Sequence, residues 1–410
     1  MKNIAPKKLH DNSRKKIADI LKRILINFKD GTNGVALNRI ELEKLSREIL
    51  KNYSEILDEK DINGIVYENF SNFLPNHDLD LFTKRITDIS DDEHKSFSNS
   101  VLSELDRLPV TYDIYFPLPK LELEKSVEVS SEIMLFVGAT LLGTEIGFGN
   151  PKTTYLKIQA NGYASRDKNQ SAIYYALSKM KKFIEIGRLK GIFWTSPFDN
   201  ALYSLLGQHS IEIIKAQVIE SEYPNKVTSC LLDVNISTYL AKIRLLLEWE
   251  KLDLLELIKV PQSETINKIS TTFNIIDNEE ISDNCNGLKR ALEWSFDAEA
   301  DEDEKISFVK KCISLESALG EGNETDSITD RLSDRCAFLV SKTPNERNAT
   351  RKSIKEIYKL RSKYVHGVID RFTEENRKSA DSCHWYLDKV LNKELDELEH
   401  WHEKKFRKNV

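Results

Sequence analysis

The spacing of apolar residues changes twice along the chain and predicts three regions of different structure. In the first hundred residues, apolar side chains recur every three or four positions, as in Ile17–Leu25 and Ile40–Ile49. This is the period of an amphipathic helix that packs one face on a core. The acidic run Asp91–Glu93 interrupts the pattern. The sequence therefore predicts a mostly helical region over residues 1–105.

From Val110 the pattern changes to short segments rich in β-branched and aromatic residues, which are typical of strands. We expect an α+β domain over residues 106–273, with helices packed on an antiparallel or mixed sheet. The expected strands are Val110–Phe116, Val127–Val129, Ile133–Val137, Tyr155–Ile158 and Val227–Val234, and the expected helices are Gln170–Ile186 and the leucine-rich Tyr239–Ile258.

A polar stretch with four acidic residues follows and predicts a linker over residues 274–285. Beyond it, every long segment has helical period, which predicts an all-α bundle over residues 286–410. The expected helices lie near 286–299, 304–319, 327–341, 347–366 and 378–404. The fold class is thus multidomain, with an N-terminal helical plus α+β region followed by a C-terminal helical bundle.

Composition is compatible with this division. A chain of 410 residues is long for one core, and a hydrophobic content of 40% with 31% charged residues is typical of a soluble protein. We expect no signal peptide, and the longest apolar run, Ile133–Leu142, is too short to cross a bilayer. The five cysteines lack paired spacing and indicate free thiols. We therefore expect a cytoplasmic protein without a membrane segment.

The net charge of −6 argues against nucleic-acid binding through the overall field of the protein, although a local patch remains compatible with it. Arg351, Lys355, Lys359 and Lys363 recur every four residues and form one stripe on a predicted helix. Such a stripe either contacts phosphates or is a solvated helix face, and the sequence leaves both alternatives open.

One segment near the C-terminus combines an apolar helical face with two residues suited to chemistry. Tyr358–Gly367 reads Tyr-Lys-Leu-Arg-Ser-Lys-Tyr-Val-His-Gly, with Arg361 in the middle of the apolar arc. A guanidinium keeps its proton, so on a packed face it must be paired or must line a polar cleft. His366 falls in the expected last turn, before Gly367 at a helix-ending position. A helix C-terminus favours the imidazolium form, which suits proton exchange near neutral pH.

This decapeptide resembles the signature of HEPN domains, in particular the Apea-like branch. The similarity continues upstream through Leu288–Trp294, Cys312–Gly320 and Ile328–Leu339. It covers roughly residues 284–410, which is under a third of the chain.

The resemblance implies a small antiparallel helical bundle of a kind that commonly dimerises. In active members, an Arg and a His of this motif cut RNA without a metal, and the two-fold axis brings both copies into one cleft. On this chain those residues are Arg361 and His366. The position after the arginine is often Asn, Asp or His in active members and is Ser362 here. Ser362, Lys363 and Tyr364 are candidates to position the RNA backbone.

Helix geometry bears on how such a site is built. Arg361 and His366 are five positions apart, which is roughly 140° of rotation on an ideal helix. They cannot both point along one helix face. A frayed end at Gly367, or a cleft shared between two subunits, is needed to bring them to one phosphate, and this favours the dimer.

A second charged residue, Glu316, lies inside the apolar arc of the predicted helix 304–319. We hypothesise that Glu316 pairs with Arg361 across neighbouring helices. One alternative is that this pair has a purely structural role. The other is that the two charges line a cleft or an interface, since the cost of desolvation can cancel the Coulomb gain of a buried pair. His366 likewise has a structural alternative as a helix-capping histidine.

These observations lead to hypotheses from different classes. The first is an endoribonuclease that needs no metal or cofactor and cleaves RNA by 2′-OH transesterification. It would act as a homodimer through the bundle, in toxin-like or anti-phage defence. The α+β region would then sense a trigger, select RNA or hold the nuclease inactive, and a phage trigger or regulatory partner would bind through the N-terminal region. The alternative is a non-catalytic HEPN module that binds a partner protein or nucleic acid, which Ser362 and the acidic net charge favour. A ligand sensor in the α+β domain is compatible with either.

Overall fold

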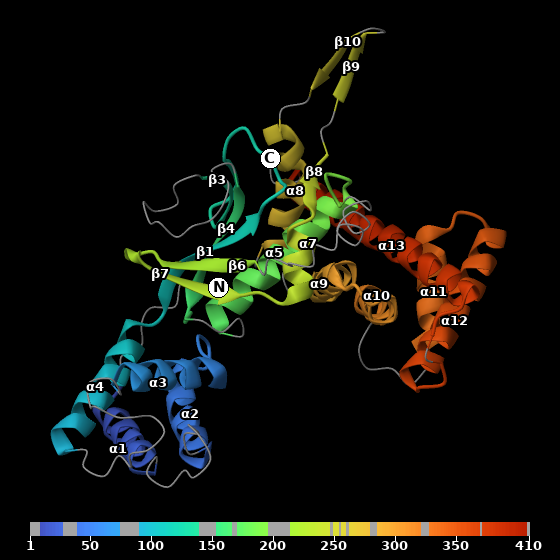
Figure 1. Cartoon of the computed structure of the whole chain (residues 1–410). Coiled ribbons are helices and arrows are strands. Elements are labelled where there is room, and N and C mark those ends of the chain that lie inside the picture. Colours follow the sequence, from blue (N-terminus) through green and yellow to red (C-terminus); the bar gives the residue numbers. More distant parts are fainter. Residues whose placement is uncertain are drawn as a thin grey trace, which may run out of the picture. The chain divides into compact units, whose positions relative to one another are not determined.

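The protein is described by a computed structural model that covers most of the chain. The described residues are 9–27, 39–73, 90–138, 153–165, 170–195, 214–246, 249–253, 256–259, 262–278, 285–320, 328–369 and 371–407. They form a mixture of helices and a smaller amount of sheet, as the predicted fold class requires (Figure 1). None of the helices in these ranges is both long enough and apolar enough to cross a membrane.

Helices dominate the described part of the chain. The helices are α1 (Asp11–Asn27), α2 (Arg39–Tyr53), α3 (Glu59–Phe73), α4 (Asp91–Arg107), α5 (Ser171–Leu189), α7 (Val234–Leu240), α8 (Gln262–Asp277), α9 (Asn286–Ala300), α10 (Glu304–Leu319), α11 (Ile328–Val340), α12 (Pro344–Val365) and α13 (Glu374–Arg407). The strands are β1 (Val110–Leu118), β2 (Val127–Ser130), β3 (Ile133–Val137), β4 (Thr154–Gly162), β5 (Phe193–Thr195), β6 (Lys215–Glu220), β7 (Tyr223–Leu231), β8 (Ile243–Leu245), β9 (Trp249–Asp253) and β10 (Glu256–Lys259).

The chain divides into two compact units. The first contains residues 1–115, 158–177 and 216–231, and the second contains residues 116–157, 178–215 and 232–410. These ranges do not follow the predicted domain boundaries at 105 and 273, because the chain enters each unit more than once. The helical character of the N-terminal region is confirmed in α1, α2, α3 and α4.

In the first unit, helices α1–α4 pack through apolar faces that the sequence predicts. Ile17 and Leu21 of α1 are fully buried, and Phe97 of α4 meets Phe70 of α3 edge to face at 6.3 Å between ring centroids. The predicted break at Asp91–Glu93 is wrong, because these residues form the first turn of α4 behind the capping residue Ser90. Acidic side chains stabilise this position by facing the positive end of the helix.

One six-stranded sheet has the strand order β2-β3-β4-β1-β6-β7. Within the first unit, β1 pairs antiparallel with β6, with Tyr112 opposite Glu220. Within the second unit, β2 pairs antiparallel with β3 as a hairpin, with Val127 opposite Leu135. The expected strands from Val110 to Val234 are therefore confirmed to within a few residues at their ends.

In the second unit, the helices α9–α13 pack on one another through a continuous apolar core. In Figure 1, α11 and α12 lie side by side in shades of orange, and α13, in red, contacts both. The core residues include Leu292, Phe296, Phe308, Leu315, Ile354, Ile357, Leu387 and Leu391. The five predicted helices are all present, with ends that differ by at most a few residues. This packing holds the end of α12 in place.

Two predictions in the middle of the chain are wrong. The expected helix Tyr239–Ile258 is instead α7 followed by strand β8 and the hairpin β9–β10. Leucine favours helix only weakly, and pairing overrides it: Leu245 of β8 lies opposite Phe193 of β5. The expected linker begins inside α8, which continues to Asp277 because Ile275 and Ile276 are buried. Residues 279–284 of that linker lie outside the described residues.

Candidate functional site

The predicted site lies at the C-terminal end of α12, and both ends of this helix are well defined. At its start, the hydroxyl of Thr343 accepts a hydrogen bond from the N–H of Glu346, whose carboxylate accepts one from the N–H of Thr343. This reciprocal capping box satisfies two backbone donors. Further along, the phenol of Tyr358 donates to the carbonyl of Cys312 on α10 at 3.2 Å. The helix is therefore anchored one turn before the site.

The end of α12 is closed by Gly367, as the sequence predicts. Gly367 has φ +70°, a left-handed conformation that glycine adopts without strain. Its N–H donates to the carbonyl of Tyr364 at 3.0 Å, and the N–H of Val368 donates to the carbonyl of Lys363 at 2.8 Å. This pair of bonds is the Schellman motif. It leaves His366 as the capping residue, with its side chain exposed to solvent.

Arg361 forms the ion pair that the sequence analysis hypothesised. Its Nη2 lies 3.3 Å from Oε1 of Glu316 on α10, and the two side chains are 31% and 30% exposed. Burial raises the pKa of Glu316, and the charge of Arg361 opposes this rise. The Nε–H of Arg361 is buried and has no hydrogen-bond partner among the described residues. Among these residues the guanidinium therefore has one ionic partner, and about one-third of the side chain is reachable from solvent.

The residues between Arg361 and His366 have different environments. Ser362 and Lys363 are exposed, whereas Tyr364 is partly buried. The ring of Tyr364 meets Phe372 edge to face at 6.0 Å, and the ammonium of Lys305 lies 6.0 Å from its centroid. Tyr364 is therefore positioned by packing, whereas Ser362 and Lys363 are exposed to the solvent that a ligand would replace.

The basic stripe on α12 is only partly neutralised. Arg351 pairs with Asp334 on α11, and Lys355 lies 2.7 Å from Asp330 of the same helix. Lys359 and Lys363 are exposed and form no ion pair within the described ranges. Their predicted role as phosphate contacts stays a prediction.

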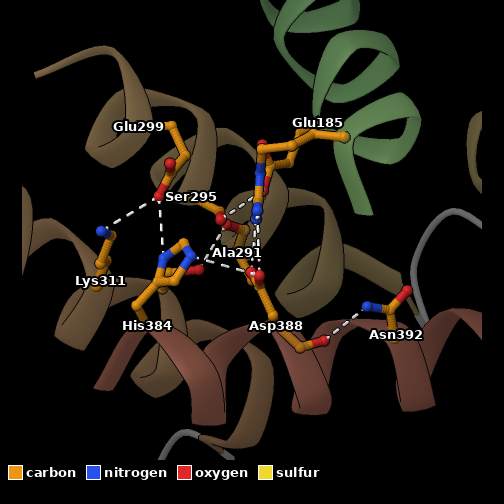
Figure 2. Close-up of polar contacts among 10 residues, drawn as sticks. Glu185, Ala291, Ser295, Glu299, Lys311, His384, Asp388 and Asn392 are labelled. Atoms are coloured by element: carbon orange, nitrogen blue, oxygen red, sulfur yellow. Dashed lines mark hydrogen bonds and ion pairs between the residues drawn. The ribbon is translucent and has the colours of Figure 1, made fainter. Parts of the chain in front are cut away.

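A second polar cluster, in the interior of the second unit, was not predicted from the sequence. We call Glu185, Arg188, Ser295, Glu299, Lys311, His384 and Asp388 the interior cluster. Figure 2 shows His384 and Asp388 projecting from α13 toward Ser295 and Glu299 of α9, with Glu185 of α5 opposite them.

Arg188 is at the centre of the interior cluster, and each of its three side-chain nitrogens donates to a carboxylate. Its Nη2 donates to Glu185 at 2.7 Å and to Asp388 at 2.6 Å, while Nε and Nη1 make further bonds of 3.0 Å and 3.1 Å to the same two carboxylates. The hydroxyl of Ser295 donates to Glu185 at 2.6 Å. Burial alone would lower the pKa of Arg188, but the charge of Glu185 and the bonds to Asp388 raise it. The arrangement is a charged clamp between α5 and α13.

His384 occupies the outer side of the interior cluster. Its Nδ1 is 3.2 Å from Oε1 of Glu299 and its Nε2 is 3.5 Å from Asp388. The Nδ1 contact is at ion-pair distance but is not aligned as a hydrogen bond. Burial would raise the pKa of Glu299, but His384, Lys311 and Arg188 together lower it. The carboxylate therefore stays charged.

A histidine follows an arginine a second time near the C-terminus, seven positions apart at Arg377 and His384, and the structure does not bring these two residues together. Arg377 pairs with Glu304 at 3.0 Å on the surface, whereas His384 faces Glu299 and Asp388. Each residue has its own carboxylate partners. The interior cluster joins residues about 200 positions apart in sequence, as in the Arg188–Asp388 pair. Local spacing carries no signal for such a contact.

No group of three or more His, Cys, Asp and Glu side chains able to hold a metal ion occurs in the part of the chain that the structure describes. Comparisons with protein-family models, with curated proteins and with solved structures gave no match for this chain. The resemblance to HEPN domains therefore stays a prediction from the residues quoted for it.

Proposed function

We propose that this chain is a metal-independent endoribonuclease whose active site is built around Arg361 and His366. The observation that supports this most is the state of Arg361. Among the described residues its one ion pair is the 3.3 Å contact with Glu316, and its side chain is about one-third exposed. A guanidinium in this state can bind the non-bridging oxygens of a phosphate.

In the proposed reaction, a base removes the proton of a ribose 2′-OH, and the oxygen attacks the adjacent phosphorus. The bond to the 5′-oxygen breaks, an acid protonates this leaving oxygen, and a 2′,3′-cyclic phosphate remains. His366, exposed at the helix end, serves as the base or the acid. Arg361 stabilises the charge that accumulates on the phosphate oxygens. Ser362, Lys363 and Tyr364 hold the backbone on either side.

A homodimer accounts for the geometry better than a single chain does. Arg361 faces α10 through Glu316, whereas His366 is exposed at the cap, roughly 140° away around the helix. Two apolar residues near this cap, Val365 and Val368, are 52% and 68% exposed. Contact between two caps would cover this surface and place His366 of one subunit near Arg361 of the other.

The wider role follows from the same proposal. Such an endoribonuclease would act in the cytoplasm, in toxin-like or anti-phage defence, where cutting cellular RNA halts growth. Unrestrained cleavage harms the cell, so residues 1–273 would hold the nuclease inactive until a trigger or a regulatory partner binds.

The test is cleavage of total RNA by the purified protein in EDTA. We expect cleavage with 2′,3′-cyclic phosphate ends, and we expect His366→Ala to abolish it with a nearly unchanged unfolding midpoint. His400→Ala, at another exposed histidine on α13, is the matched control and should cleave normally. Retained cleavage by His366→Ala would refute the assignment of this histidine.

The second candidate is a non-catalytic module of the same fold, which one observation favours. Glu316 already neutralises Arg361 within the chain, as a structural ion pair would. Intact RNA in EDTA, together with a stable dimer in solution, would support this module over the enzyme.

A further inference from the structure

The face formed by α11 and α12 carries an aromatic ring that is unusually open. Phe338 of α11 is 60% exposed, although burial of such a side chain is favourable. The guanidinium carbons of Arg347 and Arg351 lie 4.6 Å and 5.7 Å from its ring centroid. Cations at these distances are attracted to the ring and fix its orientation, while more than half of its surface stays available.

The arginine closest to the ring is also incompletely paired. The Nε–H of Arg347 is buried and has no hydrogen-bond partner among the described residues, and no carboxylate there forms an ion pair with it. Arg351 is held by Asp334 and by Asn348 at 3.1 Å. Arg351 is therefore fixed beside the ring of Phe338, whereas the guanidinium of Arg347 can still donate to a ligand.

Charge distinguishes this face from the rest of the chain. Residues 330–366 contain ten Lys and Arg residues and four Asp and Glu residues, whereas the whole chain has a net charge of −6. Asp330 and Asp334 neutralise Lys355 and Arg351, and Lys359 and Lys363 stay unpaired in the described structure. This segment therefore has an excess of six positive charges, which attracts a polyanion.

The same face leads to the proposed active site. His366 follows Lys355 by 11 positions and Lys359 by seven, so all three lie within about 40° of one another around α12. From Arg351 to His366 the helix rises about 22 Å. At the stacked spacing of about 3.4 Å per nucleotide, this length corresponds to about six nucleotides.

We infer that the α11–α12 face is a binding track for single-stranded RNA, in which a base stacks on Phe338 and the backbone follows Arg347, Lys355 and Lys359 toward His366. Exposed aromatic rings beside arginines bind unpaired bases with little sequence preference. This inference rests on the proposed function, because it assigns the strand a direction toward the residue that cuts it.

The test measures affinity apart from cleavage. A fluorescein-labelled 12-nucleotide single-stranded RNA is titrated with the full chain carrying His366→Ala, and the anisotropy is recorded. Adding Phe338→Leu should weaken RNA binding about tenfold or more, since stacking on one aromatic ring contributes this much. Adding Phe338→Trp instead should leave the RNA affinity unchanged, because an aromatic ring is kept. The ratio of the 12-nucleotide affinity to that of a trinucleotide should fall with Phe338→Leu.

Trp385 provides the matched control on α13. It is 51% exposed, with the ammonium of Lys389 at 5.7 Å from its ring, so Trp385→Leu removes a similar aromatic–cation pair elsewhere on the bundle. Trp385→Leu should leave the affinity unchanged. Equal losses at both positions, no loss at Phe338, or equal binding of an acidic peptide of the same charge would each overturn the RNA track. Cleavage by the native chain in EDTA would still stand in those cases, so the two proposals fail separately.

Discussion

Arg188 and Arg361 are both arginines on mostly apolar helix faces, and their surroundings differ in one respect. Arg188 donates to two carboxylates at distances from 2.6 Å to 3.2 Å and has a side chain only 16% exposed. Arg361 has one carboxylate at 3.3 Å among the described residues and a side chain 31% exposed. Every nitrogen of the first guanidinium donates to a carboxylate, and in this sense it is saturated, whereas the second guanidinium is not.

This difference separates a structural charge from one available to a ligand. A buried charge whose partners are all within the protein resists any competing ligand, because exchange would leave two carboxylates unpaired. A guanidinium that is about one-third exposed and has one carboxylate partner among the described residues loses little when a phosphate replaces that partner. Saturation of donors, rather than the presence of an ion pair, is therefore the feature that marks Arg361 as a candidate.

The largest expected effect comes from removing the saturated arginine. Arg188→Ala leaves Glu185 and Asp388 as uncompensated charges, and breaking such a buried pair costs about 3–5 kcal/mol of unfolding free energy. Arg361→Ala should cost about 1 kcal/mol or less, as for a half-exposed pair. Denaturant unfolding followed by tryptophan fluorescence measures both. Equal losses for the two variants would show that Arg361 is as structural as Arg188.

The features that the sequence predicts are those that depend on local patterns of residues. The period of apolar residues is a local signal, so it located α9–α13 and the closure of α12 by Gly367. The ion pair between Glu316 and Arg361 could also be predicted from the sequence, because each residue is a lone charge on an apolar helix face.

Other features depend on contacts that no local pattern records. Arg188 meets Asp388 only after α5 and α13 pack, and a charged residue on a helix looks solvated until its neighbour is known. The stretch after Leu240 has the leucine content of a helix, but β8 is a strand because β5 pairs with it. In both cases a partner far along the chain decided the outcome.

Asp61 in the first unit extends the comparison to a buried acid whose hydrogen-bond partners are neutral. Its contribution to the pH dependence of the unfolding free energy should be intermediate in size between the effects at Arg188 and Glu316. Its two oxygens accept hydrogen bonds from the N–H of Ser171 at 2.7 Å and of Asp58 at 2.9 Å, and the residue is fully buried. Burial raises its pKa to about 6, although these bonds oppose the rise. Neutral donors therefore satisfy the oxygens without compensating the charge.

The sign of the resulting pH dependence follows from this rise. The folded state holds a proton on Asp61 up to about pH 6, whereas the unfolded chain releases it near the ordinary value of 3.8. The contribution to stability is present at acidic pH and is lost as the pH rises through 6. Relative to Asp61→Asn, the native chain should gain up to about 3 kcal/mol between pH 7 and pH 4. A constant difference between the two proteins across this range would contradict the raised pKa.

The smallest effect should come from Glu316→Gln, which removes the one carboxylate that pairs with Arg361 among the described residues. Unfolding free energy should fall by less than about 1 kcal/mol, because the pair is partly exposed and gains little net energy. The affinity for labelled RNA, measured in the His366→Ala background, should rise, since phosphate no longer competes with Glu316 for the guanidinium. Asp388→Gln provides the contrast, as it should lower stability strongly without raising RNA affinity. If Glu316→Gln instead weakened RNA binding, Arg361 would depend on its carboxylate for orientation, and the two arginines would differ in degree only.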